Sequence, residues 1–178
     1  MNILYISGSP RRGGNTDYLL NMLRAAIGGT MLRLADYDVR ACQACRDCRG
    51  SGECVLQDDM RRVIIPKLLQ SDAVIMGTPV YYNNVSGQMK LFMDRTHCLT
   101  GLLRNKIGGA VVVGRKYGAE GAITAIHAFM LKHEMIPANR GVFGMAFDRG
   151  EIREDQEAIK ATQRLGERVE ELGSLLGK

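Results

Sequence analysis

Short runs of apolar residues alternate with amphipathic helical patterns along the chain. The runs at 2–6, 73–77 and 107–113 carry apolar side chains or glycine at almost every position, rather than at every second one. Strands that are apolar on both faces are typical of a parallel sheet that helices cover on both sides. The alternation therefore predicts an α/β fold with a buried parallel sheet.

Weaker signals complete this alternation. Two further strands are expected at 30–34 and 141–147. Pro66 lies inside a helical pattern and predicts a kink there, because proline has no N–H donor. Helices are expected from about residue 16 to the glycines at 28–29, after Asp58-Asp59, and at about 87–98, 122–133 and 155–172. We expect a single domain over residues 1–178, with an irregular loop rich in Cys, Gly and Arg at about 35–57.

Composition and charge narrow the class of protein. The 178 residues are 46% hydrophobic, and no apolar stretch approaches the roughly 20 residues that a membrane helix needs. The N-terminal residues lack the pattern of a secretory signal, so we expect a cytoplasmic protein with no membrane partner. The net charge is +5, but aromatic residues are only 6% and Trp is absent, so we expect no nucleic-acid partner. Arginines gather at 11–12 and 40–49, which favours small anionic ligands.

The loop between the first strand and the first helix has the chemistry of a phosphate site. It reads SGSPRRGGNT at 7–16, with glycines, hydroxyls and a helix N-terminus together. Gly14-Asn15 stands where a nucleoside-triphosphate loop has Lys-Ser/Thr, and the dinucleotide pattern G-x-G-x-x-G is absent. The alternative is a glycine-rich turn with a solvated arginine pair.

Two later loops are expected at the same edge of the sheet, where the strands of an α/β fold end. The loop at 78–87 contains two adjacent tyrosines and two asparagines, which could flank a planar heterocycle and bond its edge. Local packing of the tyrosines is the alternative. The loop at 114–121 would close the site from the other side.

Together, SGSPRRGGNT and TPVYYNNVSGQMKLFMDR at 78–95 resemble the NAD(P)H-dependent FMN reductases of the flavodoxin-like superfamily. The resemblance covers about residues 2–135 and implies a three-layer sandwich, a five-stranded parallel sheet with helices on both faces. It implies FMN, with the phosphate held by Ser9, Arg11, Asn15 and Thr16. It also implies that Pro79, Val80, Tyr81, Tyr82 and Asn83 lie along the flavin ring, with Gly114, Arg115 and Gly118 nearby. The charged Arg11-Arg12 pair favours the reductase branch over small electron-carrier flavodoxins.

Four of the five cysteines form one compact motif, Cys42-x2-Cys45-x2-Cys48-x5-Cys54. In a cytoplasmic protein such a cluster favours metal binding or redox chemistry over stable disulfides. Zinc sites usually use two separated C-x2-C pairs, whereas successive x2 spacings resemble the ferredoxin run. Gly50 and Gly52 are expected to turn the chain back toward the fourth cysteine. Zinc, or a redox-active loop without metal, stays open at this point.

The cysteine motif and the VLQDDM that follows it at 55–60 resemble the iron-sulfur flavoproteins of anaerobic prokaryotes. This resemblance implies a 4Fe–4S cluster on the four cysteines beside FMN, and an oxidoreductase that relays electrons between two-electron and one-electron partners. It implies a ferredoxin-like carrier or NAD(P)H as partner, a small acceptor such as quinone, oxygen or peroxide, and a homodimer or homotetramer. No side chain is identified as a catalytic acid or base.

Two alternatives remain at this point. The first is an NAD(P)H-dependent FMN or quinone reductase without a cluster. The second is a zinc-stabilised binding module, which the absence of a basic stripe disfavours. The fifth cysteine, Cys98, lies at the end of a helical pattern and is interpreted as a buried small hydrophobe.

Overall fold

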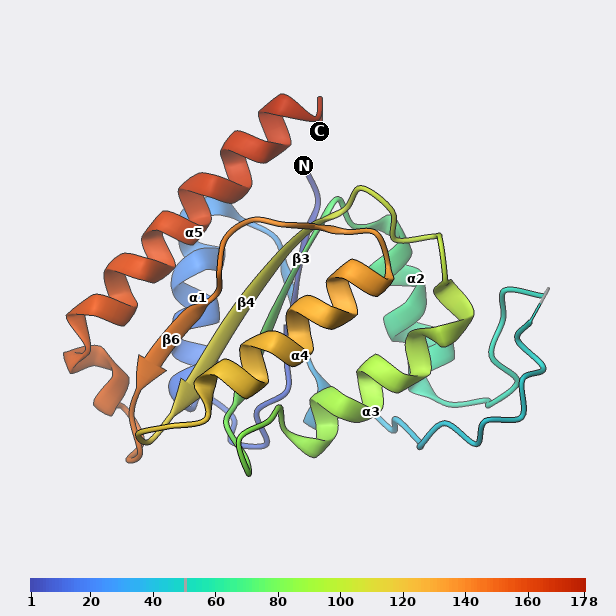
Figure 1. Ribbon diagram of the computed structural model, residues 1–178, viewed down its shortest axis with the longest axis horizontal. Helices are drawn as coiled ribbons and strands as arrows, with labels where there is room; N and C mark the ends of the chain where they lie inside the picture. Colours follow the sequence, from blue (N-terminus) through green and yellow to red (C-terminus); the bar gives the residue numbers. More distant parts are fainter. Residues whose placement is uncertain (50) are drawn as a thin grey trace.

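A parallel β-sheet lies at the centre of the protein in this computed structural model, which describes residues 1–49 and 51–178 (Figure 1). The strand order is β2-β1-β3-β4-β5, β6 also pairs with β4, and every pair is parallel. This order is that of the flavodoxin-like folds, so the predicted fold class is confirmed. Gly50, one of the two glycines expected to turn the cysteine loop, lies outside the described residues. The strands are β1 Ile3–Ser7, β2 Thr30–Arg33, β3 Ala73–Pro79, β4 Ile107–Gly114, β5 Ile136–Pro137 and β6 Val142–Met145.

The fifth position of the sheet differs from the single strand predicted at 141–147. Two short strands share it, because β5 pairs with the start of β4 and β6 with its end. Pro137 is tolerated in the first piece because the amides on either side of it, those of Ile136 and Ala138, make the bonds toward β4, at 2.9 and 2.7 Å. The predicted strand was therefore too long at both ends. The short strand β5, which precedes β6 at the same sheet position, was missed.

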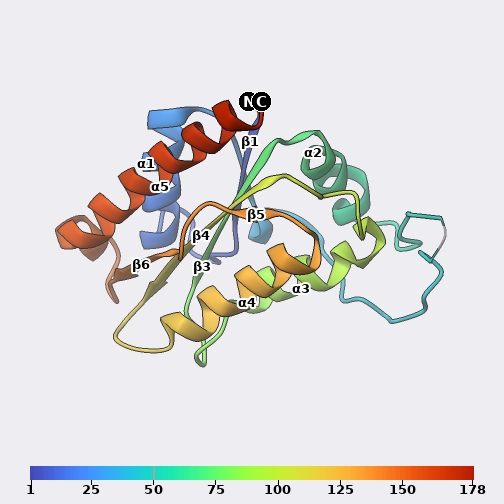
Figure 2. The same ribbon diagram turned by 45° about the horizontal axis from the view of Figure 1, so that its top comes forward.

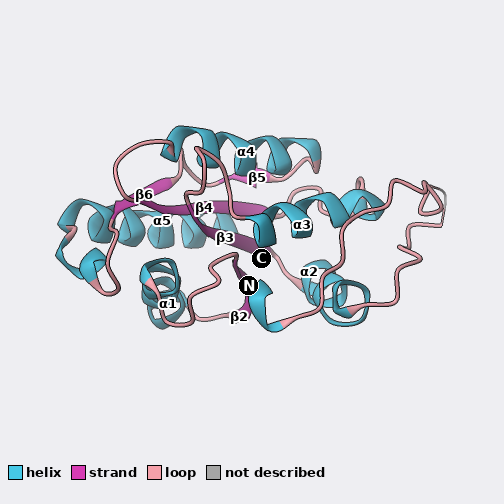
Figure 3. Ribbon diagram, turned by 90° about the horizontal axis from the view of Figure 1, so that it is seen from below, coloured by secondary structure: helices cyan, strands magenta, loops and turns pink. Residues whose placement is uncertain are grey.

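Helices cover both faces of the sheet (Figure 3). Alternate strand residues explain this, because successive side chains point to opposite faces. Tyr5 and Ile75 pack in the core that α1 and α5 cover, whereas Ile6 and Met76 pack in the core under α2, α3 and α4. The α-helices are α1 Asn15–Ile27, α2 Ile65–Gln70, α3 Gly87–Arg95, α4 Ala119–Lys132 and α5 Gln156–Leu175. Shorter helical turns lie at Leu34–Asp36, Met60–Ile64, Thr96–Leu99 and Glu151–Glu154.

The helical region that contains Pro66 changes type just before the proline. A π-helical turn at Met60–Ile64 precedes α2, and Pro66 lies in the first turn of α2, where a missing N–H costs least. Of the two aspartates expected to cap this region, Asp58 accepts a hydrogen bond from the Arg61 amide at 3.3 Å. Asp59 instead accepts from the amide of Asp38, at 2.9 Å.

The cysteine-containing segment projects from one end of the sheet, beyond α2 and α3, in two views of the molecule (Figures 1 and 2). It leaves the sheet after the carboxyl end of β2. Among the described residues, no helix is both long and apolar enough to cross a membrane.

Candidate functional site

The loop after β1 turns into α1 through Gly14, whose amide donates to the Arg11 carbonyl at 3.1 Å. Ser9 is buried, and its hydroxyl oxygen accepts from the Arg11 amide at 3.3 Å. Thr16 is buried in the first turn of α1, while the Arg11 side chain is exposed. A helix N-terminus with a neighbouring hydroxyl and guanidinium favours an anion. The structure thus gives the predicted loop its expected strand-to-helix geometry, and the phosphate role stays a prediction.

A buried ion pair that sequence analysis missed supports this loop from below. Asp17 and Arg33 lie 2.9 Å apart, with side chains only 1% and 8% exposed. The Asp17 carboxylate also accepts from the Ser7 hydroxyl and, at 2.8 Å, from the Gly13 amide. Arg33 donates to the Ser9 carbonyl at 3.3 Å. One carboxylate therefore joins β1, β2, α1 and the loop between them.

The loop after β3 forms a tight turn. Tyr81 and Asn84 bond each other's backbone at 2.9 and 3.0 Å. The two residues between them, Tyr82 and Asn83, have φ values of 50° and 59°, which is typical of a hairpin turn with two left-handed central residues. Tyr81 is 43% exposed and Tyr82 fully exposed, so both rings are available to a ligand.

The loop after β4 packs directly against that turn. Gly118 precedes α4 with φ of 88°, and a Cβ there or at Gly121 would overlap Asn83. Gly114 ends β4, and a Cβ at this position would lie 2.8 Å from the Val80 side chain. The second and third predicted loops therefore meet, as expected.

Ser86 joins the first and second loops. Its hydroxyl donates to the Gly8 carbonyl at 2.6 Å and accepts from the Met89 amide as the cap of α3. The Gly8 amide in turn donates to the carbonyl of Gly77 in β3, at 2.8 Å. All three predicted loops are thus connected at the carboxyl edge of the sheet.

We expect Gly121→Ala to destabilise the protein, although alanine favours helix by up to about 1 kcal/mol. The new methyl group would overlap the Asn83 backbone carbonyl, which cannot rotate away as a flexible side chain can. Overpacking of this kind costs about 1–3 kcal/mol, so the free energy of unfolding in urea should fall. Gly87→Ala is the control, because a Cβ at Gly87 would meet no atom within 4 Å. Equal stability of the two variants would contradict the close packing of these loops.

A fourth segment, at 147–150, completes this edge and was missed. Asn15 bonds two backbone groups of the segment, at 2.8 Å each. The Arg115 guanidinium lies 4.6 Å from the centre of the Phe147 ring, and Arg149 donates to a carbonyl of the first loop at 2.7 Å. The signal was available, because the segment follows the last strand. The segment was missed because the predicted strand extended to Phe147 and so included its first residue.

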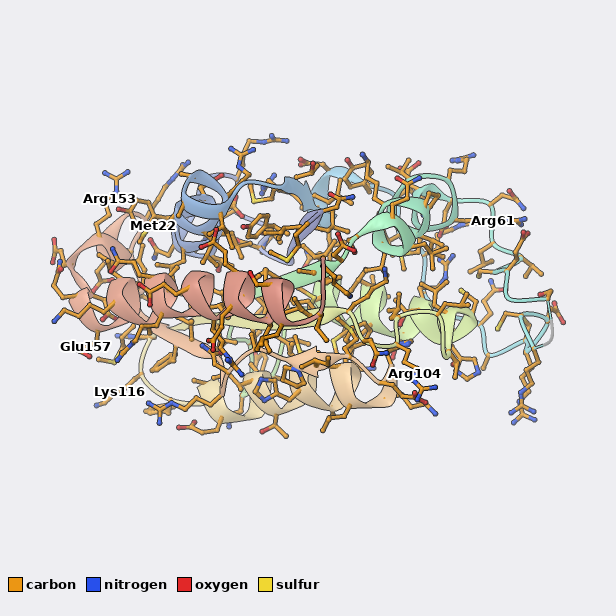
Figure 4. The ribbon with its side chains drawn as sticks, turned by 90° about the horizontal axis from the view of Figure 1, so that it is seen from above. Met22, Arg61, Arg104, Lys116, Arg153 and Glu157 are labelled. Carbon is orange, nitrogen blue, oxygen red and sulfur yellow. The ribbon has the colours of Figure 1, made fainter. Side chains whose placement is uncertain are left out.

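Arginines from three loops lie at this edge of the sheet. Arg12 pairs with Asp36 at 2.7 Å. Within residues 1–49 and 51–178, Arg11, Arg115 and Arg149 form no ion pair. Guanidinium groups without an ion-pair partner suit an anionic ligand. Lys116 lies at the same end of the molecule, far from Arg61 at the base of the cysteine segment (Figure 4).

The second candidate site is a cavity of about 370 Å³ in the cysteine-containing segment. Its lining comes from that segment and from the end of α3 with the turn that follows. Ala44 and Arg46, on either side of one cysteine, have φ of 53° and 68°, a region that non-glycine residues rarely adopt. Five cysteines line the cavity: Cys42, Cys45, Cys48, Cys54 and Cys98.

The thiol groups that line this cavity are not arranged as ligands around one point. In the part of the chain that the structure describes, no group of three or more His, Cys, Asp or Glu side chains could hold a metal ion as placed. Cys42 and Cys45 are exposed, and Cys48 and Cys54 are half-buried. Bonds to a metal contribute to organising such a site. The four motif cysteines fit a thiolate-bound metal group in residue type and in lining one cavity, but not in the placement of their sulfur atoms.

Cys98 differs from the other four. It is buried, and burial raises the pKa of its thiol to about 11, with the nearby Cys54 and Cys48 adding to the shift. It is therefore protonated at neutral pH. Its interpretation as a buried small hydrophobe is consistent with this position.

A buried arginine connects the cavity to the core. Arg95 and Asp58 form an ion pair in which both side chains are fully buried. Burial alone would raise the pKa of Asp58, but hydrogen bonds from Arg95 and from the Arg40 amide outweigh it and hold the pKa below its ordinary value. Arg95 also donates to the Cys54 sulfur at 3.4 Å.

Comparison with known proteins gives one consistent family. Residues 1–150 match the sequence family described as NADPH-dependent FMN reductase. The chain is 37% identical to an iron-sulfur flavoprotein of Methanocaldococcus jannaschii over the full length of both chains. It is 29% identical to an iron-sulfur flavoprotein of Archaeoglobus fulgidus, covering 97% of this chain and 95% of the other.

Solved structures show the same fold at low sequence identity. RosB with bound 8-demethyl-8-formylriboflavin-5′-phosphate has a TM-score of 0.82 at 16% identity, covering 99% of this chain and 80% of that one. A flavodoxin from the domain Archaea has a TM-score of 0.63 at 17% identity, covering 97% and 99%. These similarities concern the fold alone.

Proposed function

The chain belongs to the NADPH-dependent FMN reductase family, and from this premise we propose that it is an iron-sulfur flavoprotein that relays electrons between two-electron and one-electron partners. As a member of that family it is an FMN-dependent oxidoreductase. FMN accepts two electrons and releases them singly, whereas a 4Fe–4S cluster exchanges one at a time. The protein supplies binding, orientation and charge around both groups.

We place the FMN at the carboxyl edge of the sheet. Ser9, Arg11, Asn15 and Thr16 would hold its phosphate, supported by the helix start and the guanidinium groups at this edge. The Asn15 side chain already bonds the segment at 147–150, so that segment would border the phosphate. The flavin ring would contact the remaining predicted residues: Pro79, Val80, Tyr81, Tyr82, Asn83, Gly114, Arg115 and Gly118.

The observation that carries the cluster proposal is that one cavity is lined by all four cysteines of the motif. Cys42, Cys45, Cys48 and Cys54 would be its ligands. The relatives named iron-sulfur flavoprotein support this, since they match nearly the whole chain. The family supports NAD(P)H or a small acceptor as partner in general. A ferredoxin-like carrier, a quinone, oxygen or peroxide, a homodimer or homotetramer and a cytoplasmic location are part of the proposal.

A second candidate function is an FMN or quinone reductase that uses NAD(P)H and has no cluster. The spread of the cysteines, with no ready-made metal site among the described residues, favours it. Iron, acid-labile sulfide, zinc and flavin should be measured per chain on protein purified without oxygen. About four irons, four sulfides and one FMN would support the relay, whereas FMN without iron would support the plain reductase. One tightly bound zinc would instead favour a structural metal site.

We expect Arg11→Ala to lower the affinity for FMN by about tenfold or more, because a hydrogen bond to a charged group contributes about 1.5–3 kcal/mol. Riboflavin has no phosphate, so its affinity should hardly change. Fluorescence titration of the flavin-free protein with both ligands checks this. Arg104→Ala is the control, since Arg104 is exposed and pairs with Glu134 away from this edge (Figure 4). Equal losses for FMN and riboflavin would refute the phosphate role.

A further inference from the structure

The end of α3 brings a fully buried guanidinium to the cysteine cavity. Arg95 lines that cavity, and its side chain is 0% exposed. Its donors reach three different groups: the Asp58 carboxylate at 3.0 Å, the Arg40 carbonyl at 2.8 Å and the Cys54 sulfur at 3.4 Å. A buried charge needs such partners, because taking a charge out of water without a partner costs several kcal/mol of folding free energy.

One donor of this guanidinium is left over. The Arg95 Nε atom is buried and has no hydrogen-bond partner among the described residues. Buried polar groups are nearly always satisfied, so an orphaned charged donor beside a cavity points to an acceptor that belongs there. Thiolate or sulfide sulfur in the cavity would be such an acceptor.

The same guanidinium fixes the two ends of the cysteine segment. Arg40 precedes the first cysteine; its carbonyl accepts from Arg95 at 2.8 Å, and its amide donates to Asp58 at 3.1 Å. Cys54 is the last cysteine of the motif, and Arg95 contacts it directly. The Arg95–Asp58 pair therefore holds both the entry and the exit of the segment against α3.

We propose that Arg95 is a positioning residue of the cluster site, which orients Cys54 and donates hydrogen bonds to sulfur so that the reduced cluster is stabilised. This inference rests on the proposed function, because it requires a cluster on the four cysteines. Hydrogen bonds to the sulfurs raise the reduction potential of an iron-sulfur cluster, and partners behind the ligands orient them. Asp58 in turn holds the guanidinium in place.

A simpler interpretation is that the pair only stabilises the fold. Removing the arginine alone would leave a buried carboxylate unpaired and could unfold the protein. The double variant Arg95→Met/Asp58→Asn avoids this, because it removes both charges and leaves the net charge of the pair at zero. A change in potential then reports the lost donor rather than a change in total charge. Arg95→Lys keeps the charge but loses the planar fork that reaches Asp58 and Cys54 together.

The experiment is a redox titration of the cluster by electron paramagnetic resonance on anaerobically prepared protein with FMN bound. Iron, FMN content and the urea midpoint are measured alongside. We expect the midpoint potential to fall in Arg95→Lys and to fall further in the double variant. Arg168→Lys is the control, because Arg168 lies in α5, pairs with Glu171 at 2.7 Å and lines neither proposed cofactor site, so the cluster potential should stay unchanged.

Two outcomes would overturn the inference. One is a cluster potential equal to that of the wild type in both Arg95 variants. The other is loss of iron together with FMN and a lowered urea midpoint, which would make the pair merely structural. If iron is lost while the FMN content and the urea midpoint stay unchanged, the result would support the positioning of Cys54. A wild-type protein that binds no iron would instead refute the proposed function, and the inference would fall with it.

Discussion

Cys48→Ala is expected to abolish the iron-sulfur cluster and to leave FMN bound. Cys48 lines the cavity together with the other three cysteines of the motif, and a cubane cluster needs four thiolate ligands. The flavin is proposed to lie at the carboxyl edge of the sheet, held by other loops. Iron and sulfide per chain should therefore fall from about four each to near zero, while flavin absorbance is kept.

Cys98→Ala is the matched control for this experiment. Cys98 lines the same cavity, but it is buried and its raised pKa keeps it protonated, so its loss should leave the iron content unchanged. Unchanged iron in Cys48→Ala would show that the ligand assignment is wrong. Equal loss of iron in both variants would show that iron binding does not depend specifically on the four cysteines of the motif.

The second large effect is expected at the base of the phosphate loop. Asp17→Ala would leave the buried Arg33 guanidinium without its partner and remove the acceptor of the Ser7 hydroxyl and the Gly13 amide. Breaking a buried pair in this way costs about 3–5 kcal/mol. At roughly 2–4 °C per kcal/mol for a chain of this size, the melting temperature should fall by about 6–20 °C.

FMN affinity should fall in the same variant, because Gly13 and the start of α1 lose the support that shapes the loop. Asp94→Ala is the control, since its pair with Lys90 is solvent-exposed and contributes at most about 0.5 kcal/mol. Scanning calorimetry and flavin titration measure both effects. An Asp17 variant that melts within about 2 °C of the wild type would contradict the structural role assigned to the pair.

Apolar patterning was sufficient to predict most of the fold. The strands at 73–77 and 107–113 are buried on both faces, as their continuous apolar pattern predicts, and β3 and β4 extend them by only one or two residues. The fifth strand could not be predicted in the same way. Its interruption between β5 and β6 depends on how each piece pairs with β4, which is a tertiary property.

Local signals also limited the prediction of helix boundaries. The predicted start of α4 at 122 was three residues late, because Gly118 in a left-handed conformation begins the helix at Ala119. The predicted end of α3 at 98 was also wrong. The α-helix ends at Arg95 and a tighter turn continues to Leu99, which a hydrophobic pattern cannot distinguish from α-helix.

The meeting of the three loops proposed to bind FMN was predictable, because parallel strands end at one edge. The buried charged residues that support these loops could not be predicted from the sequence. Asp17 and Arg33 lie 16 residues apart, and only the pairing of β1 with β2 brings them together. The contact between Arg95 and Cys54 spans 41 residues and likewise depends on packing of α3 against the cysteine segment.

The base of the cysteine segment is closed by two reciprocal hydrogen bonds. The Asp38 amide donates to the Asp59 carboxylate at 2.9 Å, and the Asp59 amide donates to the Asp38 carbonyl at 3.1 Å. A loop whose ends are joined in this way can change length cheaply, since doubling it costs only about 0.6 kcal/mol of closure entropy. In evolutionary terms, a second redox centre could be gained, enlarged or lost here as a single local insertion, without any change in the order or register of the sheet.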